Sequence, residues 1–342
     1  MLNKFNKLKV LIVGDVMIDR YMYGKVNRIS PEAPVPIVEL QRTEERLGGA
    51  ANVALNIKAL GATPYLYSVV GDDTEGSLFV NIMAQYDLPT QGILQSSERQ
   101  TTVKTRVMAG THQMLRLDSE IKTDLNRTDV DNLLSKIEFF LDKEKIDVII
   151  LQDYNKGVLS IPIIQNMMAH ATKKAIQVAV DPKKNNFFAY KNATLFKPNL
   201  KEIRDALPFE VTTSLESLQR ASDYLRTHLG QQYTMITLSE KGLFLEADTE
   251  FTSPLGMGVE RNAKIYPTQS RNISDVSGAG DTVISVAALG LAAGFDAETI
   301  ALLSNLAGGQ VCEFSGVVSV NKKQLENEYD QILTAKKPNT PN

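Results

Sequence analysis

The sequence has little of what several large classes of protein require. Its 342 residues include one cysteine, Cys312, so no disulfide can form within the chain, and we expect a reducing compartment. The three histidines, His112, His170 and His228, lack the spacing of metal ligands. No apolar run reaches the roughly 18 residues that a membrane-spanning helix needs. The first residues enter a strand pattern without the apolar region of a signal peptide, so we expect a cytoplasmic protein with no membrane partner.

The sequence also lacks a large excess of positive or negative charge. The 37 basic and 40 acidic side chains give a net charge of -3, and the isoelectric point is about 5.8. Proteins that bind nucleic acid or an anionic membrane through charge concentrate their basic residues, whereas the charges here are spread along the chain. We therefore expect no nucleic-acid partner and take a small molecule as the default ligand.

Short β-branched runs alternate with segments of helical period, which is typical of a doubly wound α/β fold with a mostly parallel sheet and helices on both faces. The predicted strands are residues 9–14, 65–71, 147–153, 177–182 and 233–239. The predicted helices are residues 50–60, 74–86, 128–141, 162–173, 215–229 and 278–293.

Two stretches break this alternation. Residues 21–46 and 98–118 are rich in Val, Ile and Thr and lack a helical period, so they predict a small second β-sheet. We expect this sheet to be a lid that also pairs two subunits, because the following apolar positions need a partner face: Val35, Ile37, Val38, Val103 and Val107. The chain is then a single domain over residues 1–333, with a disordered tail over 334–342.

Residues with almost no side chain open the helical segment near the end of the chain. Gly278, Ala279 and Gly280 come just before Asp281. The first N–H groups of a helix lack intrahelical partners and carry the positive end of its dipole, so a phosphate can bind there if side chains leave room. Asp281 could then accept a proton from an alcohol beside that phosphate. The alternative is that Asp275 or Ser277 caps the helix and the small residues serve packing.

A second group of small residues, Gly48 to Ala51, opens another predicted helix and precedes Asn52, whose amide can donate to and accept from a hydroxyl. Together the two motifs indicate a polyol bound beside a phosphate. GGAAN and DxxGAGD resemble the two signatures of the PfkB (ribokinase-like) family of carbohydrate kinases. The segments QDYNKG, DPK, KPNLKE and SEKG resemble motifs in the middle of that family, so the resemblance extends from about residue 9 to residue 320.

Further segments resemble the heptose 7-phosphate kinases of this family: GDVMIDRYMYG, NRISPEAPVPIVE, TTVKTRV with HQMLRLD, and PTQSRNISDVSGAGDTV. The resemblance implies a ribokinase-like fold and an ATP- and Mg²⁺-dependent kinase. Its acceptor would be the anomeric hydroxyl of D-glycero-D-manno-heptose 7-phosphate, on the route to ADP-heptose and the lipopolysaccharide core. Many members carry an adenylyltransferase with an HxGH-type motif, which is missing here, so we expect a stand-alone kinase. Residues 248–267 fit the family pattern poorly.

The resemblance implies roles for individual residues in the sugar site. Asp281 would be the base, and the amides of residues 278–280 would form the anion hole. Asp15 and Asp19 follow the first strand at its carboxyl end, where open α/β sheets bind ligands, although Asp19 could instead cap a loop. The sugar site would be completed by Gly48, Gly49, Asn52 and Asp153. The acceptor's own phosphate would bind one or two of four cations that are otherwise solvated strand charges: Lys104, Arg106, Arg116 and Lys156.

The nucleotide site follows from the same resemblance. Its phosphates and ribose would contact Lys183, Ser239, Lys241 and Gly242, with Asn305 near the adenine. Lys241 could equally be a surface lysine. Asn199 and Glu202 stand three residues apart, so on a helical turn their oxygens face one side and can hold Mg²⁺ through waters. The alternative is a helix-start cap.

Two rival functions remain open at this point. Another kinase of the family, acting on ribose, a fructose phosphate or a nucleoside, would share the catalytic motifs. A catalytically silent sensor of a sugar or nucleotide would share the fold, although the intact Asp281 and GAG sequence argue against it.

Overall fold

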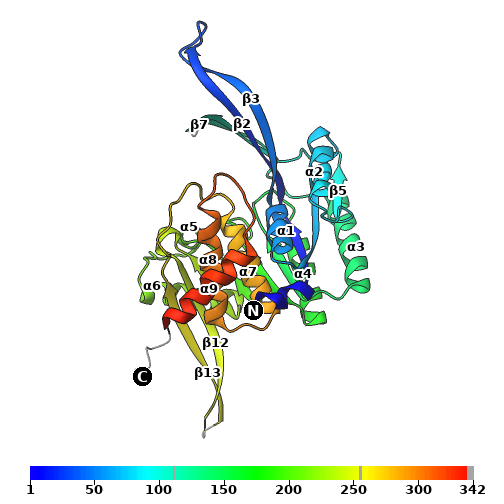
Figure 1. The fold of residues 1–342 in the computed structure, drawn as a ribbon. Coiled ribbons are helices and arrows are strands. Elements are labelled where there is room, and N and C mark those ends of the chain that lie inside the picture. Colours follow the sequence, from blue (N-terminus) through cyan, green and yellow to red (C-terminus); the bar gives the residue numbers. More distant parts are fainter. Residues whose placement is uncertain (111, 254–255, 337–342) are drawn as a thin grey trace.

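The computed structural model describes residues 1–110, 112–253 and 256–336, and within them a nine-stranded sheet forms the centre of the molecule (Figure 1). The strand order is β13-β12-β11-β10-β9-β8-β1-β4-β5, with parallel pairing from β5 to β11 and antiparallel pairing from β11 to β13. The strands are β1 (Lys9–Gly14), β4 (Thr63–Gly71), β5 (Ile93–Ser96), β8 (Val148–Gln152), β9 (Gln177–Asp181), β10 (Leu195–Phe196), β11 (Tyr233–Thr237), β12 (Leu243–Ser253) and β13 (Gly256–Tyr266).

Helices cover both faces of this sheet. In β1, Val10 and Ile12 join one hydrophobic cluster, whereas Leu11 and Val13 join the other, because successive side chains of a strand point to opposite faces. The first cluster includes α1 (Ala50–Ala59), α2 (Thr74–Gln85), α7 (Ala279–Ala292), α8 (Ala297–Val311) and α9 (Lys322–Lys336). The second includes α3 (Arg127–Lys143), α4 (Ile161–Lys174), α5 (Leu200–Ala206) and α6 (Leu215–Leu229). Short 3₁₀ turns, η1 (Leu2–Lys7) and η2 (Ser239–Lys241), complete the elements.

The predicted α/β architecture is confirmed, and each predicted strand and helix lies within a residue or two of an observed one. The sequence prediction missed three helices, α5, α8 and α9. In α8 the apolar and small residues surround the helix, which removes the polar stripe that a periodicity search needs, and α5 is a short segment. The tail prediction needs a correction, because α9 continues through Lys336; the rest of that tail, residues 337–342, lies outside the described residues.

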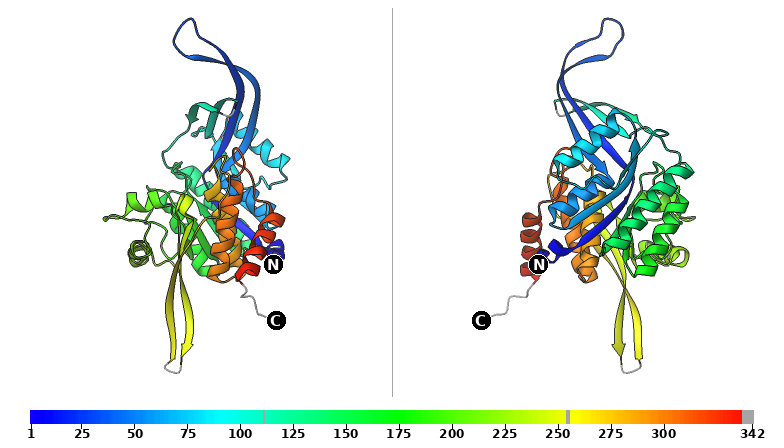
Figure 2. Two further views of the ribbon diagram at one scale, coloured as in Figure 1. Left: turned by 60° about the vertical axis from the view of Figure 1, so that its left-hand side comes forward. Right: turned by 90° about the vertical axis from the view of Figure 1, so that its right-hand side faces the viewer.

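The lid predicted from residues 21–46 and 98–118 is a four-stranded sheet that rises from one end of the molecule (Figure 1). Its strands, in the order β3-β2-β6-β7, are β2 (Val16–Ile29), β3 (Pro36–Gly49), β6 (Val103–Ala109) and β7 (His112–Ser119). The segment that fits the family pattern poorly forms most of β12 and β13, an antiparallel pair that extends away from the lid (Figure 2).

The two faces of the lid sheet differ in chemistry, since directly paired residues of neighbouring strands share a face. One row across β3, β2, β6 and β7 is Arg46, Asp19, Lys104 and Asp118, and the next is Glu44, Tyr21, Arg106 and Arg116. We call this the charged face. On the opposite face, Met22 pairs with Val107, and Leu115 and Leu117 of β7 are 52% and 54% exposed. Val103, expected at a subunit interface, is instead buried within its own subunit.

None of the helices in the described ranges is long and apolar enough to cross a lipid bilayer.

Candidate active site

The carboxyl ends of three parallel strands meet the first turns of α1 and α7. Gly14, Gln152 and Asp181 end β1, β8 and β9 in register with one another. The helices α1 and α7 pack together and begin with the two glycine motifs. Residues from opposite ends of the chain are therefore concentrated at one edge of the sheet, where open α/β folds bind their ligands.

Asp281, in the first turn of α7, is 3% exposed and lies at the centre of this edge. Its Oδ1 accepts hydrogen bonds from Gln152 Nε2 at 3.0 Å and from the Tyr154 hydroxyl at 2.6 Å. Its Oδ2 accepts from Asn52 Nδ2 at 2.8 Å. Asn56 donates to Asn52 Oδ1 at 3.3 Å, which turns the amide nitrogen of Asn52 toward the carboxylate. The two glycine motifs thus meet at one carboxyl group.

Burial raises the pKa of Asp281 to about 6, and the negative charge of Asp181 acts in the same direction. The hydrogen bonds from Tyr154 and Asn52 and the charge of Lys197 oppose this rise. A carboxylate with such a pKa is mostly ionised at neutral pH and is a stronger base than an exposed aspartate.

The helices α1 and α7 begin differently from others in the fold. Their N-caps are Gly49 and Gly278, at φ 62° and 80°, a region that glycine enters at little cost. Side chains instead cap the following helices: Asp73 for α2, Asn126 for α3, Asn199 for α5, Ser214 for α6 and Asp296 for α8. Asp275, considered as a cap for α7, accepts from the N–H groups of Ser277 and Gly316. The start of α7 is therefore suited to an anion.

Gly280 has no conformational reason to be glycine, because its backbone lies outside the positive-φ region. A Cβ atom at this position would come no closer than 3.6 Å to Lys197 Nζ and 3.8 Å to Asp181 Oδ2, which is ordinary contact. Lys197 is buried and pairs with Asp181 at 2.9 Å. Gly280 thus lies between a helix N-terminus and an ammonium group, two features that attract an anion.

Two of the expected sugar ligands have internal partners instead. Asp15 is buried and accepts backbone hydrogen bonds from Tyr154, Lys156 and Val158 at 2.7–3.0 Å. Asp153 accepts from Asn155 N and from the Tyr190 hydroxyl, both at 2.7 Å. These carboxylates hold the loop after β8, which satisfies buried N–H groups that would otherwise be costly. Asn52 is likewise fully buried and donates to Asp281, and its contact with sugar stays a prediction.

Asp19 is the expected sugar-binding carboxylate that lies in the lid sheet itself, on β2. It pairs with Arg106 across β2 and β6, and a Cβ at Gly48 would lie 2.3 Å from its Oδ2. Arg106 also lies against the ring of Tyr21, with 5.2 Å between the guanidinium carbon and the ring centroid. The absence of a side chain at Gly48 therefore makes room for Asp19 at the base of the charged face.

The four cations expected around the acceptor phosphate do not form an open basic pocket. Each pairs with a carboxylate: Arg106 with Asp19, Arg116 with Asp118, Lys104 with Asp118 and Glu120, and Lys156 with Glu120. Lys122 also reaches Glu120, at 3.1 Å, and the lysines hold the pKa of Glu120 near 2 against the opposing effect of burial. Partly buried cations are unfavourable without such partners.

Lys183, Asn199 and Glu202 form a cluster beside Asp181. Asn199 and Glu202 make the reciprocal capping box of α5 that we considered as the alternative to magnesium binding. Glu202 also pairs with Lys183, whose Nζ lies 5.4 Å from the ring centroid of Tyr154. Across residues 1–110, 112–253 and 256–336, no group of three or more His, Cys, Asp and Glu side chains forms a ready metal site. Because Mg²⁺ keeps several waters and uses one or two carboxylates, Glu202 still fits a water-mediated contact.

The remaining nucleotide candidates lie close together. Ser239 and Gly242 have φ of 54° and 96°, and a Cβ at Gly242 would meet the Tyr266 carbonyl at 2.0 Å. Asn305 donates to the carbonyls of Tyr266 and Pro267 at 3.3 and 2.9 Å. Lys241 instead reaches Thr213 Oγ1 at 2.9 Å on the exposed surface.

Sequence reasoning missed four side chains of this site: Gln152, Tyr154, Asp181 and Lys197. Gln152 and Asp181 are the last residues of β8 and β9, and Lys197 directly follows β10. The signal that could have found them is position, since polar residues at the carboxyl ends of predicted parallel strands converge on one edge of the sheet.

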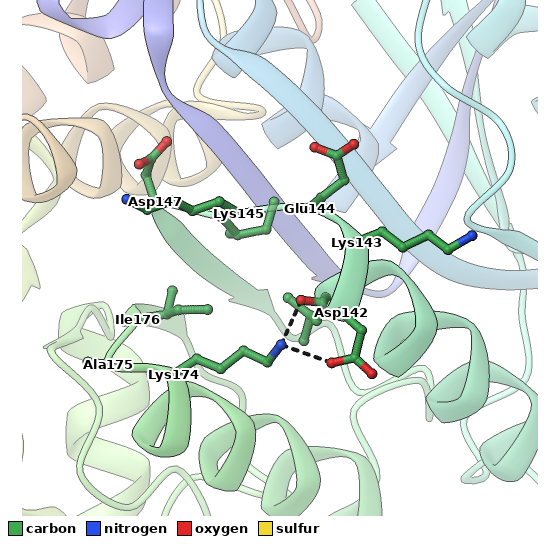
Figure 3. Close-up of a pocket in the computed structure, with 10 residues that line it drawn as sticks. Asp142, Lys143, Glu144, Lys145, Asp147, Lys174, Ala175 and Ile176 are labelled. Carbon is green, nitrogen blue, oxygen red and sulfur yellow. Dashed lines mark hydrogen bonds and ion pairs between the residues drawn. The ribbon is translucent and has the colours of Figure 1, made fainter.

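A pocket of about 520 Å³ lies elsewhere (Figure 3). Its lining, residues 141–147 and 174–176, precedes β8 and β9, so it opens at the amino ends of the strands. Lys174 donates there to the Leu141 carbonyl and to Asp142. It is unrelated to the cluster around Asp281.

The chain is similar in sequence and in fold to proteins that are already known. The model of a family described as pfkB family carbohydrate kinase matches residues 7–324. The chain is 35% identical over 340 residues to the bifunctional protein HldE of Syntrophotalea carbinolica and 38% identical over 322 residues to that of Magnetococcus marinus. These matches cover 97% and 94% of the chain but 66% and 64% of the relatives, so the chain spans just under two thirds of their length. Phosphofructokinase-2 from Escherichia coli, in complex with potassium, superposes with a TM-score of 0.75 at 17% identity, covering 95% of this chain and 99% of that one.

Proposed function

Because this chain belongs to the pfkB family of carbohydrate kinases, and is thus a phosphotransferase with an alcohol group as acceptor, we propose that its acceptor is a heptose 7-phosphate. The γ-phosphoryl group of ATP would pass to the anomeric hydroxyl of D-glycero-D-manno-heptose 7-phosphate and give the 1,7-bisphosphate for ADP-heptose synthesis. The observation that carries the chemistry is a buried carboxylate, Asp281, one residue after the glycine that borders the open start of α7.

The site's residues support each part of such a transfer. Asp281 would take the proton of the attacking hydroxyl, which is required only late in a loose phosphoryl transition state. The N–H groups at residues 278–280 and the ammonium group of Lys197 would stabilise the negative charge on the transferred group. The carboxylate of Glu202 would hold Mg²⁺ through water, and that ion would neutralise charge on the nucleotide phosphates.

The choice of acceptor rests on the lid. Most of the segments that resemble heptose 7-phosphate kinases lie in β2, β3, β6 and β7, whereas PTQSRNISDVSGAGDTV leads into α7. The relatives named bifunctional protein HldE align over more than nine tenths of this chain. The charged face carries Asp19, suited to sugar hydroxyls, beside cations suited to a phosphate. Ribose and nucleosides carry no phosphate, so a kinase that acts on them would not need a site for a phosphate group of the acceptor.

The test is an ADP-release assay across a panel of acceptors: heptose 7-phosphate, free heptose, ribose, fructose 6-phosphate and a nucleoside. We expect the phosphorylated heptose to give the largest kcat/KM. If ribose or a nucleoside is the best substrate, the acceptor proposal is wrong and the family assignment stands. If none of them releases ADP above background, a sensor without turnover becomes the better explanation.

We expect Lys156→Ala to lower kcat/KM for heptose 7-phosphate by about 30–1000-fold, the effect of about 2–4 kcal/mol that a lost charged hydrogen bond and an unpaired phosphate produce. Lys156 is 11% exposed in its side chain and contacts Glu120 at 2.7 Å. Any of Lys104, Arg106 and Arg116 that also contacts the acceptor's phosphate should show a similar loss when replaced by alanine. The KM for ATP should change little in all these variants.

Lys122→Ala is the matched control for this series. Lys122 contacts the same Glu120, but its side chain is 70% exposed. We expect it to behave as wild type. Equal losses toward free heptose and heptose 7-phosphate in all four variants would contradict a phosphate site on the charged face.

The exposed leucines of β7, Leu115 and Leu117, support a further proposal, that two subunits pair through the face of the lid that carries them. We expect a homodimer in light scattering at micromolar concentration, and we expect Leu117→Asp to shift it to a monomer, because a carboxylate cannot be buried unpaired in an apolar interface. Phe139→Asp, on α3 and away from the lid, replaces a side chain that is 63% exposed and should leave the assembly unchanged. A fully active monomeric wild type would contradict the pairing.

A further inference from the structure

We propose that Tyr154 is a positioning residue for Asp281: its hydroxyl occupies one carboxylate oxygen and leaves the other free to take the proton of the acceptor. This inference rests on the proposed role of Asp281 as the base. Tyr154 lies in the loop after β8. It would affect the reaction through its hydrogen bond to Asp281, without contacting the sugar.

The contacts at Asp281 are unequal. Among the described residues, Oδ1 accepts from both Tyr154 and Gln152, whereas Oδ2 accepts only from Asn52. A carboxylate oxygen has room for about two hydrogen bonds, so Oδ1 is filled and Oδ2 retains a lone pair. Asn56 fixes the amide of Asn52, so the single donor on Oδ2 cannot rotate away. The geometry selects Oδ2 as the basic atom.

The position of Tyr154 is set by Asp15. The carboxylate of Asp15 accepts from the backbone N–H groups of Tyr154 at 2.7 Å, Lys156 at 3.0 Å and Val158 at 3.0 Å. Gly157, at φ 87°, allows the turn, and a Cβ there would lie 2.1 Å from the Thr123 carbonyl. A buried acidic side chain at the end of β1 thus fixes the loop whose hydroxyl reaches the base. The hydrogen bonds to Asp15 thus account for the shape of the loop.

Charged groups from several elements surround the same carboxylate. Asp181 at the end of β9 raises the pKa of Asp281, whereas Lys197 after β10 lowers it, and Lys183 beside the Tyr154 ring also interacts with Asp281. Burial is the largest influence and raises that pKa to about 6, while the Tyr154 hydrogen bond counteracts it. Burial also holds the pKa of the Tyr154 phenol well above its usual value, so this group remains a donor at every working pH.

Tyr154→Phe tests the proposal through the pH dependence of kcat/KM, measured by ADP release with the best acceptor of the panel. Loss of the hydroxyl removes a hydrogen bond to the charged form of Asp281, so its pKa rises. Activity requires the ionised base, so kcat/KM falls as the pH drops through that pKa. We call this fall the acidic limb of the pH profile, and its midpoint should move upward from about pH 6 by about one pH unit. At alkaline pH, where the base is ionised again, part of the lost rate should return.

Two further variants make the result specific. Tyr329→Phe removes another buried tyrosine hydroxyl, which lies 3.0 Å from Thr299 Oγ1 far from the site, and should leave the limb unmoved. Asp15→Asn keeps the shape of the anchor but weakens its hold on the loop, and should move the limb in the same direction as Tyr154→Phe. Thermal unfolding of each variant identifies any that fail to fold.

The outcomes separate this inference from the proposal beneath it. If Asp281→Asn is inactive and the limb of Tyr154→Phe coincides with wild type, the hydroxyl does not position the base and the inference is wrong, whatever happens to the rate. If Asp281→Asn retains activity, the base assignment itself is wrong. A shifted limb in Tyr154→Phe with an unshifted one in Tyr329→Phe supports the positioning role.

Discussion

Replacing Asp281 with asparagine should lower kcat by about 10²–10⁴-fold, the range that a positioned general base contributes. The dissociation constants of ATP and acceptor should change by only a few-fold, because asparagine preserves the shape of the side chain and still occupies the site among Asn52, Gln152 and Tyr154. Single-turnover ADP release and equilibrium binding measure the two quantities separately. We expect a large loss because the proposal assigns the proton transfer to this one buried carboxyl group.

Asp129→Asn provides a closely matched control. Asp129 is also a buried aspartate in the first turn of a helix, α3, and accepts hydrogen bonds from Ser96 and Asn126. Its replacement should reduce the free energy of unfolding and leave kcat unchanged. If Asp281→Asn keeps its kcat within about tenfold of wild type, which is less than a general base contributes, Asp281 is not the base.

Gly280→Val should separate activity from folding. The Cβ of the added side chain would lie at ordinary contact distances, 3.6 Å from Lys197 Nζ and 3.8 Å from Asp181 Oδ2, so the backbone can keep its conformation and the protein should fold. The same side chain would fill the space beside the start of α7 and keep the transferred phosphate from its N–H donors. Removal of one donor of this kind typically costs about 10²–10³-fold in kcat, and we expect at least that loss.

Gly290→Ala, in the middle of the same helix, should behave in the opposite way. A Cβ at Gly290 would lie 2.8 Å from Ile300 Cγ1 in the contact between α7 and α8, so the substitution should lower the melting temperature while leaving kcat nearly intact. The pair of variants distinguishes a glycine required by a ligand from one required by packing. Normal turnover in Gly280→Val would mean that phosphate does not approach this helix end.

The parts of the fold that sequence reasoning predicted were those determined by local pattern. The alternation of β-branched runs and helical period identified β1, β8 and α6, and the glycine motifs located the starts of α1 and α7. Such features depend on neighbours in the chain, so a single sequence contains them. The helix α8 was missed because it packs against α7, α9 and the sheet, and its residues carry no polar stripe.

The partners of the polar side chains could not be predicted in the same way. A sequence shows that Asp15, Asn52 and Lys156 lie in suggestive motifs, but whether each contacts a ligand or another residue depends on pairings across the fold. Asp15 binds a loop that lies 139–143 residues later, and Asn52 meets Asp281 at a separation of 229. These separations explain why the motifs could be found from the sequence, whereas the partners of their side chains could not.

The same separations have a consequence for biosynthesis. Asn52, Gln152 and Tyr154 leave the ribosome well before the residue that they surround, and at about 5–20 residues per second the interval between Asn52 and Asp281 lasts roughly 10–50 s. Throughout that interval the nascent chain contains Asn52 but not the carboxylate, and Gln152 and Tyr154 are added partway through it. If Asp281 is the base, phosphoryl transfer can begin only after α7 has been synthesised and has docked against α1, so the appearance of activity during translation would report the docking of these two helices.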